Sequence, residues 1–195
     1  MGNIIDTIGN TPLVEITSFH ANPKVKIYAK LEGNNPAGSV KDRPALNMIR
    51  SAIERGEIKK GDRLIEATSG NTGIALAMIA SMYELELELV MPSSSTRERT
   101  LTMEAFGAQV TLLENMEICR DYAEEKAEKD GVFILNQFAN PDNYEAHVKT
   151  TGPEIWRDTQ GKITHFVSAM GTTGTIMGNS IYLKDKNPTI QIVGC

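Results

Sequence analysis

Cysteine and histidine are scarce in this 195-residue sequence, which contains only two cysteines and three histidines. Cys119 and Cys195 cannot form a disulfide framework, and neither lies in a CxxC or Cys/His spacing typical of a metal site. The three histidines, His20, His147 and His165, are scattered, and none pairs with an acid at metal-ligand or catalytic-triad spacing. This scarcity favours a reducing, cytoplasmic setting and predicts no metal site.

Long apolar runs and a basic stripe are also lacking. The longest apolar stretch, Gly73 to Met82, is too short to span a bilayer. The N-terminus lacks the basic region and following apolar stretch of a signal peptide. A formal net charge of -5 argues against a nucleic-acid-binding protein. We therefore expect a soluble protein without a membrane or nucleic-acid partner.

Apolar runs of strand length alternate with stretches of helix length almost from end to end. The expected strands are Lys26–Leu31, Arg63–Ala67, Leu87–Met91, Gln109–Leu113, Val132–Asn136, Ile163–Ala169 and Ile190–Val193. The expected helices are Asp42–Arg55, Asn71–Tyr83, Thr96–Phe106, Met116–Lys129, Gly152–Asp158 and Thr175–Lys184. Repeated strand–helix–strand units predict an α/β fold with a parallel sheet. Glycines near helix ends predict positive φ angles at Gly56, Gly61, Gly107 and Gly131.

The first of four candidate ligand-binding turns contains Lys41. Ligands collect at the carboxyl ends of strands in open parallel sheets, and this turn leads straight into a predicted helix. The helix dipole and burial would both lower the pKa of Lys41, which suits a lysine that forms a Schiff base. A lone lysine is more commonly a surface charge, so the hypothesis depends on its position.

The second and third turns combine glycine with small polar residues before a helix. An ordinary helix cap needs one polar residue, whereas the second turn supplies several, so we expect a carboxylate or phosphate site at Thr68, Ser69, Gly70, Asn71 and Thr72. The third turn offers flexible backbone and hydroxyl donors at Gly171, Thr172, Thr173, Gly174 and Thr175. A tight structural turn explains the third spacing equally well, and it is neither a Walker loop nor GxGxxG.

Gln137 lies in the fourth turn, where the pair Asn140-Pro141 is typical of a simple turn. Gln137 would matter for function only if its side chain faced the second turn. Two other polar residues are expected to be structural. His165 falls inside an apolar strand and is expected to be a hydrogen-bonded core residue, and Cys119 falls on the buried stripe of its helix and is expected to be inert.

Taken in this order, the motifs resemble those of the fold-type II pyridoxal-phosphate (PLP) enzymes, specifically the cysteine synthase (O-acetylserine sulfhydrylase) family. The resemblance covers essentially the whole chain and depends on five segments, TIGNTPL at 7–13, NPAGSVKDR at 35–43, TSGNTG at 68–73, TGPEIW at 151–156 and GTTGT at 171–175. The double threonine of the last segment is similar to the B isozyme. The fold that this resemblance implies has two α/β domains of the tryptophan synthase β-like type, three-layer parallel sheets and PLP in the cleft.

The resemblance also implies a role for each candidate residue. Lys41 would form the Schiff base with PLP and act as general base and acid, and Asn71 would hydrogen-bond the cofactor's 3-hydroxyl group. The cofactor phosphate would be held by Gly171, Thr172, Thr173, Gly174 and Thr175. The substrate's α-carboxylate would be bound by Thr68, Ser69, Gly70, Asn71, Thr72 and Gln137.

The implied reaction is β-replacement, in which acetate leaves O-acetyl-L-serine and sulfide or thiosulfate adds to give L-cysteine. The family usually forms homodimers. Two alternatives in the same class are cystathionine β-synthase and O-phosphoserine sulfhydrylase. An alternative from another class is a truncated, non-catalytic relative that binds a partner such as serine acetyltransferase.

The family pattern assigns residues 41–145 to a smaller domain and residues 1–40 and 146–195 to a larger, PLP-binding domain. Family members run considerably longer, and this sequence stops at Cys195, inside or just after an apolar strand. We therefore expect the C-terminal part of the fold, with the residue that meets the pyridine nitrogen, to be missing from this sequence.

Overall fold

The computed structural model describes residues 2–17 and 22–195, whose strands form three sheets, and His20 lies outside these residues. The central sheet is parallel and consists, in spatial order, of β5 (Gln109–Leu113), β4 (Glu86–Pro92), β3 (Arg63–Ala67) and β6 (Phe133–Ile134). A second parallel pair consists of β7 (His165–Ser168) and β8 (Gln191–Gly194). The remaining pair, β1 (Leu13–Glu15) and β2 (Tyr28–Lys30), is antiparallel.

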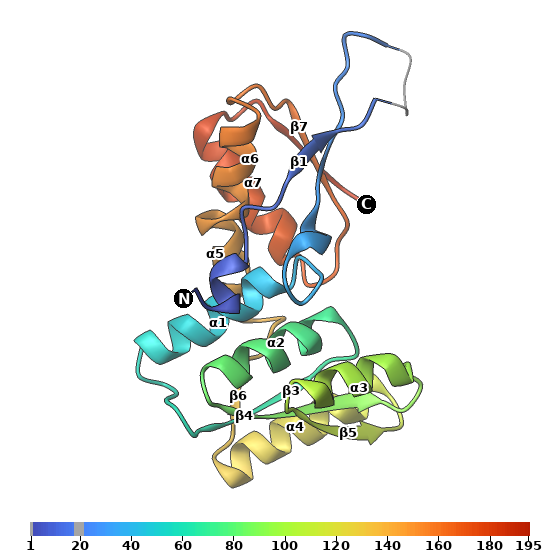
Figure 1. The fold of residues 1–195 in the computed structure, drawn as a ribbon, viewed down its shortest axis with the longest axis vertical. Helices are drawn as coiled ribbons and strands as arrows, with labels where there is room; N and C mark the ends of the chain where they lie inside the picture. The colour runs from blue at the N-terminus through green and yellow to red at the C-terminus, as the bar shows by residue number, and fades with distance from the viewer. Residues whose placement is uncertain (1, 18–21) are drawn as a thin grey trace.

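The helices divide between two halves of the molecule (Figure 1). The half with the central sheet contains α2 (Asn71–Met82), α3 (Arg97–Ala105) and α4 (Met116–Asp130). The other half contains α5 (Pro141–Lys149), α6 (Thr151–Asp158) and α7 (Gly174–Lys186). Helix α1 (Asp42–Glu54) lies between the two halves, and short 3-10 turns occur at η1 (Ile4–Thr7) and η2 (Glu32–Asn34).

Alternating strand residues build a separate core on each face of the central sheet. Leu64 and Leu89 pack in the larger core with α1 and α2, whereas Ile65 and Val90 pack with Cys119 of α4 in a smaller core on the other face. Full burial of such a side chain stabilises the fold by about 1.5–3 kcal/mol. The sheet with helices on both faces forms three layers, and the prediction of an α/β fold with a parallel sheet is confirmed.

Several local predictions are confirmed by the backbone and by burial. All four helix-end glycines have positive φ angles, namely 73° at Gly56, 86° at Gly61, 93° at Gly107 and 63° at Gly131. Cys119 is fully buried, and burial raises the pKa of its thiol, as expected for an inert residue.

Three local predictions are wrong. The β1 strand was not expected, and β2 pairs with it in an antiparallel manner. The segment after Asn140 is helix α5 and not a simple turn, because Asn140 caps it by accepting a hydrogen bond of 2.9 Å from the Asp142 N–H, and Pro141 occupies a first-turn position where proline is favoured. His165 is exposed rather than buried, because strand alternation directs its neighbour Phe166 towards the core.

Close packing of α7 on α5 predicts a large cost for one small substitution. A Cβ at Gly178 would collide with the carbonyl oxygen of Tyr144 and the Cβ of His147, and backbone cannot move aside cheaply. We expect Gly178→Ala to lower the free energy of unfolding by about 1–3 kcal/mol, measured by chemical denaturation. The control Gly33→Ala meets no atom within 4 Å and should change it little. Equal effects of the two substitutions would contradict the packing argument.

Candidate functional site

Lys41 lies at the N-terminal end of α1, on a turn held by short polar contacts. The Asp42 carboxylate accepts a hydrogen bond of 2.6 Å from the Ala37 N–H, and Ser39 Oγ accepts one of 3.1 Å from the Lys41 N–H. Burial lowers the pKa of Lys41 and raises the pKa of Asp42 to about 6. Within the described residues, the Lys41 side-chain nitrogen has no hydrogen bond or ion pair.

The second turn opens α2 with no side chain capping the helix. Gly70 is the N-cap residue, so neither Ser69 nor Asn71 acts as an ordinary cap and the first N–H groups remain available to an anion. Thr68 and Thr72 are buried beside this turn, and Asn71 is exposed.

Gln137 meets the condition for a functional role, since it faces the second turn. Its side chain is buried, and its Oε1 accepts a hydrogen bond of 2.8 Å from the Thr72 hydroxyl. The fourth turn therefore lies at the same site as the second turn.

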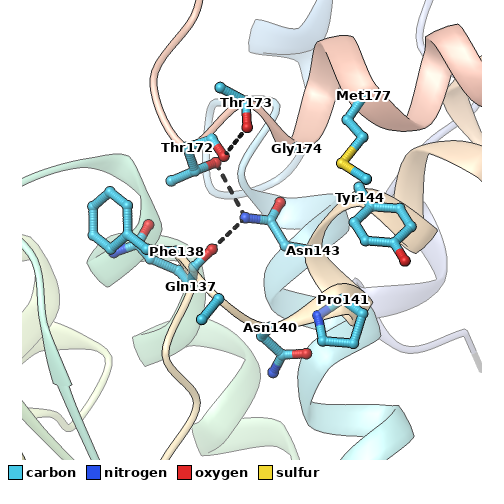
Figure 2. A pocket seen from close by; sticks show the side chains of 11 residues that line it. Gln137, Phe138, Asn140, Pro141, Asn143, Tyr144, Thr172, Thr173, Gly174 and Met177 are labelled. Carbon is cyan, nitrogen blue, oxygen red and sulfur yellow. Dashed lines mark hydrogen bonds between the residues drawn. The ribbon is translucent and has the colours of Figure 1, made fainter.

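The third turn is joined to Gln137 by Asn143 of α5 (Figure 2). The Asn143 amide donates hydrogen bonds of 2.7 Å to the Gln137 carbonyl oxygen and 3.1 Å to Thr172 Oγ1. Thr173 has a left-handed backbone with φ 63°, and as N-cap of α7 it makes no side-chain cap, so N–H groups of this turn are also free. Gln137, Asn143, Thr172, Thr173 and Gly174 help to line a cavity of about 200 Å³, which Lys41 and Asn71 do not line.

His147 connects α5 to the last threonine of the third turn, a link that the sequence did not reveal. Its Nδ1 lies 2.9 Å from the Thr151 hydroxyl, and its Nε2 lies 3.4 Å from the Thr175 hydroxyl. Burial and the positive charges of Arg43 and Lys41 lower the pKa of His147 to about 4. The ring is therefore neutral at pH 7 and can accept one hydrogen bond while donating another.

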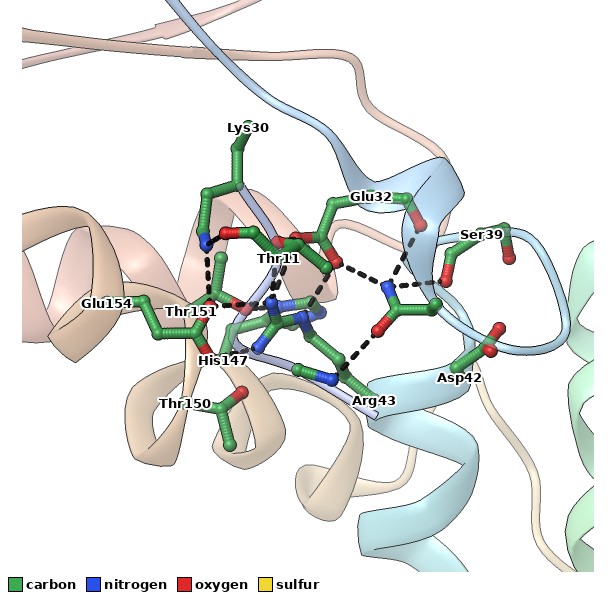
Figure 3. A network of polar contacts seen from close by, with 12 residues as sticks. Thr11, Lys30, Glu32, Ser39, Asp42, Arg43, His147, Thr150, Thr151 and Glu154 are labelled. Atoms are coloured by element: carbon green, nitrogen blue, oxygen red, sulfur yellow. Dashed lines mark hydrogen bonds and ion pairs between the residues drawn. The ribbon is translucent and has the colours of Figure 1, made fainter. Parts of the chain in front are cut away.

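Arg43, two residues after Lys41, is the centre of a buried ionic network (Figure 3). Its guanidinium donates to both oxygens of Glu154 at 2.7 and 2.8 Å and to both oxygens of Glu32 at 2.7 and 2.9 Å. Lys30 adds an ion pair of 2.6 Å to Glu154. Burial alone would raise the pKa of Glu154, but hydrogen bonds from Arg43 and Lys30 outweigh it and lower the pKa to about 2.

Glu66 is a second unexpected residue, because it is a buried acid at the carboxyl end of β3. Its oxygens accept hydrogen bonds of 2.9 Å from the Asn136 N–H and 3.1 Å from the Gln137 N–H. Burial raises the pKa of Glu66 to about 7, although these backbone bonds oppose the increase. No alternation in β3 indicated a buried acid, because every residue of the strand after Arg63 is buried.

The structure thus joins three of the four predicted turns through Thr72, Gln137, Asn143 and Thr172. In the part of the chain that it describes, no hydrogen bond joins Lys41 or Asn71 to another predicted site residue. Across residues 2–17 and 22–195, no group of three or more His, Cys, Asp or Glu side chains could hold a metal ion. None of the described helices is both long enough and apolar enough to cross a membrane.

Comparison with known proteins identifies the family. The family model for pyridoxal-phosphate-dependent enzymes matches residues 4–195, and the chain therefore belongs to that family. Within the family it is a homologue of cysteine synthase B, since it is 57% identical to that protein of Pseudomonas aeruginosa over 194 residues. The match covers 98% of this chain and 65% of the relative, so the chain spans about two thirds of its relative's length. The predicted resemblance to the B isozyme is confirmed.

Solved structures agree with this assignment. A crystal structure of O-ureido-L-serine synthase matches with a TM-score of 0.95 and 39% identity, covering 100% of this chain and 62% of that one. Cysteine synthase from Entamoeba histolytica matches with a TM-score of 0.94 and 40% identity, covering 100% of this chain and 60% of that one. The described fold is thus the corresponding part of this enzyme fold.

The depressed pKa of Glu154 predicts an acid-sensitive network. A pKa lowered from 4.5 to about 2 contributes stability that is present above pH 4.5 and is lost as the pH falls towards 2. We expect Glu154→Gln to remove this acid-dependent loss and to lower the free energy of unfolding at pH 7 by about 3 kcal/mol, because it breaks a buried ion pair. Denaturation curves at several pH values would measure both effects.

The matched control is Glu125→Gln, which removes a carboxylate from an exposed pair with Lys129. Exposed pairs contribute little, so this variant should keep the acid-dependent loss and most of the stability. An unchanged acid profile in Glu154→Gln would contradict the assignment of that loss to the Arg43 network.

Proposed function

We propose that the protein is a PLP-dependent β-replacement enzyme that makes L-cysteine from O-acetyl-L-serine and sulfide or thiosulfate. The observation that carries this proposal is the linkage of two uncapped helix N-termini by Thr72, Gln137, Asn143 and Thr172. Two separate anion sites held in one frame suit a substrate carboxylate and a cofactor phosphate. Homology to cysteine synthase B supports the choice of reaction.

The residues present fit PLP on chemical grounds. The Lys41 amine is half-buried, has a lowered pKa and makes no ion pair with the described residues, as a Schiff-base lysine requires. The turn Gly171–Thr175 offers free N–H groups and hydroxyls for the phosphate, and no atom lies within 4 Å of a Cβ built on Gly171. Asn71 is exposed at the start of α2 and would hydrogen-bond the 3-hydroxyl group. When bound, PLP supplies the electron sink for the reaction.

The protein residues would bind the substrate and move protons. The N–H groups and hydroxyls of residues 68–72, with the amide of Gln137, would hold the α-carboxylate and fix the substrate's orientation. The lowered pKa of Lys41 makes its neutral amine more available at physiological pH, so it can take the α-proton and later return one. We also propose that residues 41–145 form a smaller domain and that residues 1–40 and 146–195 belong to a larger, PLP-binding domain.

The cofactor assignment predicts a visible absorbance band when PLP is added to the purified chain. Borohydride reduction followed by peptide mass mapping should place the PLP group on Lys41, and Lys41→Ala should lose the band, because it removes the amine. Lys59→Ala, at an exposed lysine, is the matched control and should keep it. A band that persists in Lys41→Ala, or PLP mapped to another lysine, would contradict the assignment.

A second candidate, use of O-phospho-L-serine, is favoured by Arg99. This exposed residue of α3 donates a hydrogen bond of 3.0 Å to the Ser69 carbonyl oxygen, so a positive charge lies beside the proposed substrate loop. A guanidinium there suits a phosphate leaving group.

Arg99→Ala separates the two substrates. If O-phospho-L-serine is used, kcat/KM for it should fall by about tenfold, the loss expected for one charge-assisted contact. The value for O-acetyl-L-serine should change much less. Arg97→Ala, at an exposed position of the same helix, is the matched control. An equal loss for both substrates would assign Arg99 a purely structural role at Ser69.

A further inference from the structure

Glu66 has no part in the proposed proton transfers, yet it is a buried acid directly below the proposed substrate site. It is only 3% exposed and is the penultimate residue of β3, the strand that leads into residues 68–72. Within the described chain, its hydrogen bonds come from the backbone of the Asn136–Gln137 turn. It has no ion-pair partner among those residues. Burial of an unpaired carboxylate costs free energy, which the two backbone hydrogen bonds partly offset.

The Glu66 carboxylate replaces strand pairing beyond the last paired residues of β3 and β6. Strand β6 pairs with β3 through Phe133 opposite Leu64 and Ile134 opposite Ile65, and the pairing stops there. The next residue of β3 is Glu66, whose side chain binds the N–H groups that follow β6. These two successive N–H groups converge on one carboxylate, an arrangement that favours an anion.

The backbone turns sharply at this point. Asn136 has φ 53°, in the left-handed region, which asparagine adopts more readily than most residues other than glycine. Only an acceptor at both oxygens satisfies the two N–H groups, and a glutamine would direct one NH₂ donor against an N–H.

We infer that Glu66 is a positioning residue that holds Gln137 in place to bind the substrate's α-carboxylate. The inference rests on the proposed function, because Gln137 must be the residue that touches substrate. Glu66 fixes the Gln137 backbone N–H, Asn143 fixes its carbonyl oxygen, and Thr72 then meets its side chain at 2.8 Å. Loss of the Glu66 contacts would free one of these three anchors.

Glu88 provides a matched control on the neighbouring strand. It is also buried, but it faces the other core, where it contacts Lys126, Thr111 and Tyr122 away from the site. The variants Glu66→Gln and Glu88→Gln therefore make the same chemical change in two different places.

Hydrogen exchange tests the positioning role without turnover. Above pH 7, where Glu66 with its pKa of about 7 is mostly ionised, the Asn136 and Gln137 amides of Glu66→Gln should exchange about tenfold faster than in the wild type, the effect of losing a hydrogen bond to a charged group. In Glu88→Gln these two amides should be unchanged. Titration with PLP should give the same affinity in both variants. Unchanged exchange at residues 136 and 137 in Glu66→Gln would overturn the inference.

Kinetics test the consequence for substrate. Glu66→Gln should raise KM for O-acetyl-L-serine by about tenfold with a much smaller change in kcat, because binding is affected more than chemistry. The same substitution in a Gln137→Ala background should add little, since the positioned side chain is already gone. An undiminished effect in that background would overturn the role of Gln137.

Failure of the proposed function and failure of the positioning role of Glu66 give different results. If the wild-type chain shows no turnover with O-acetyl-L-serine, the proposed function of this chain fails, while the exchange comparison still decides whether Glu66 holds the turn. If Glu66→Gln does not fold, exchange in the wild type decides. The Asn136 and Gln137 amides should then exchange more slowly than that of exposed Phe138, and fast exchange at both would overturn the inference.

Discussion

The arrangement of this chain depends on the ionic network around the buried guanidinium of Arg43. The guanidinium joins α1 to Glu32, Thr11 and Glu154, which are 11, 32 and 111 residues away in the sequence. A buried charge is tolerated only when its donors are satisfied, and removal of one partner leaves an uncompensated charge. The network therefore forms as a unit and brings the N-terminal segment, α1 and α6 together. Since Lys41 lies two residues before Arg43, the same unit fixes the place of Lys41.

Helix α5 organises the other side of the site. Asn143 and His147 are four residues apart, so they lie on one face and reach Thr172 and Thr175. On the facing helix α7, glycines also recur four residues apart, at Gly174 and Gly178. A side chain at either glycine would collide with α5, with Asn143 or with the Tyr144 backbone. The close approach of α5 and α7 is thus what allows two short polar side chains of α5 to hold the third turn.

Much of the fold could be predicted from the sequence, because its signals are local. The order of apolar strand runs and helical stretches and the positive φ angles of the helix-end glycines depend on neighbouring residues, and these predictions are confirmed. Helix α5 was missed because the Asn140-Pro141 pair signals a turn and a helix start equally well. The pairing of Gln137 with Thr72 and the partners of Arg43, His147 and Glu66 were beyond prediction from pattern. Those contacts join residues that only the folded chain brings together.

In the proposed function, Lys41 must lose its proton before it can act as a base. A carboxylate paired with its ammonium would raise the pKa of the lysine and keep it charged. The adjacent acid, Asp42, instead accepts a hydrogen bond from the Ala37 N–H. Burial then lowers the pKa of Lys41 without a carboxylate partner to oppose it.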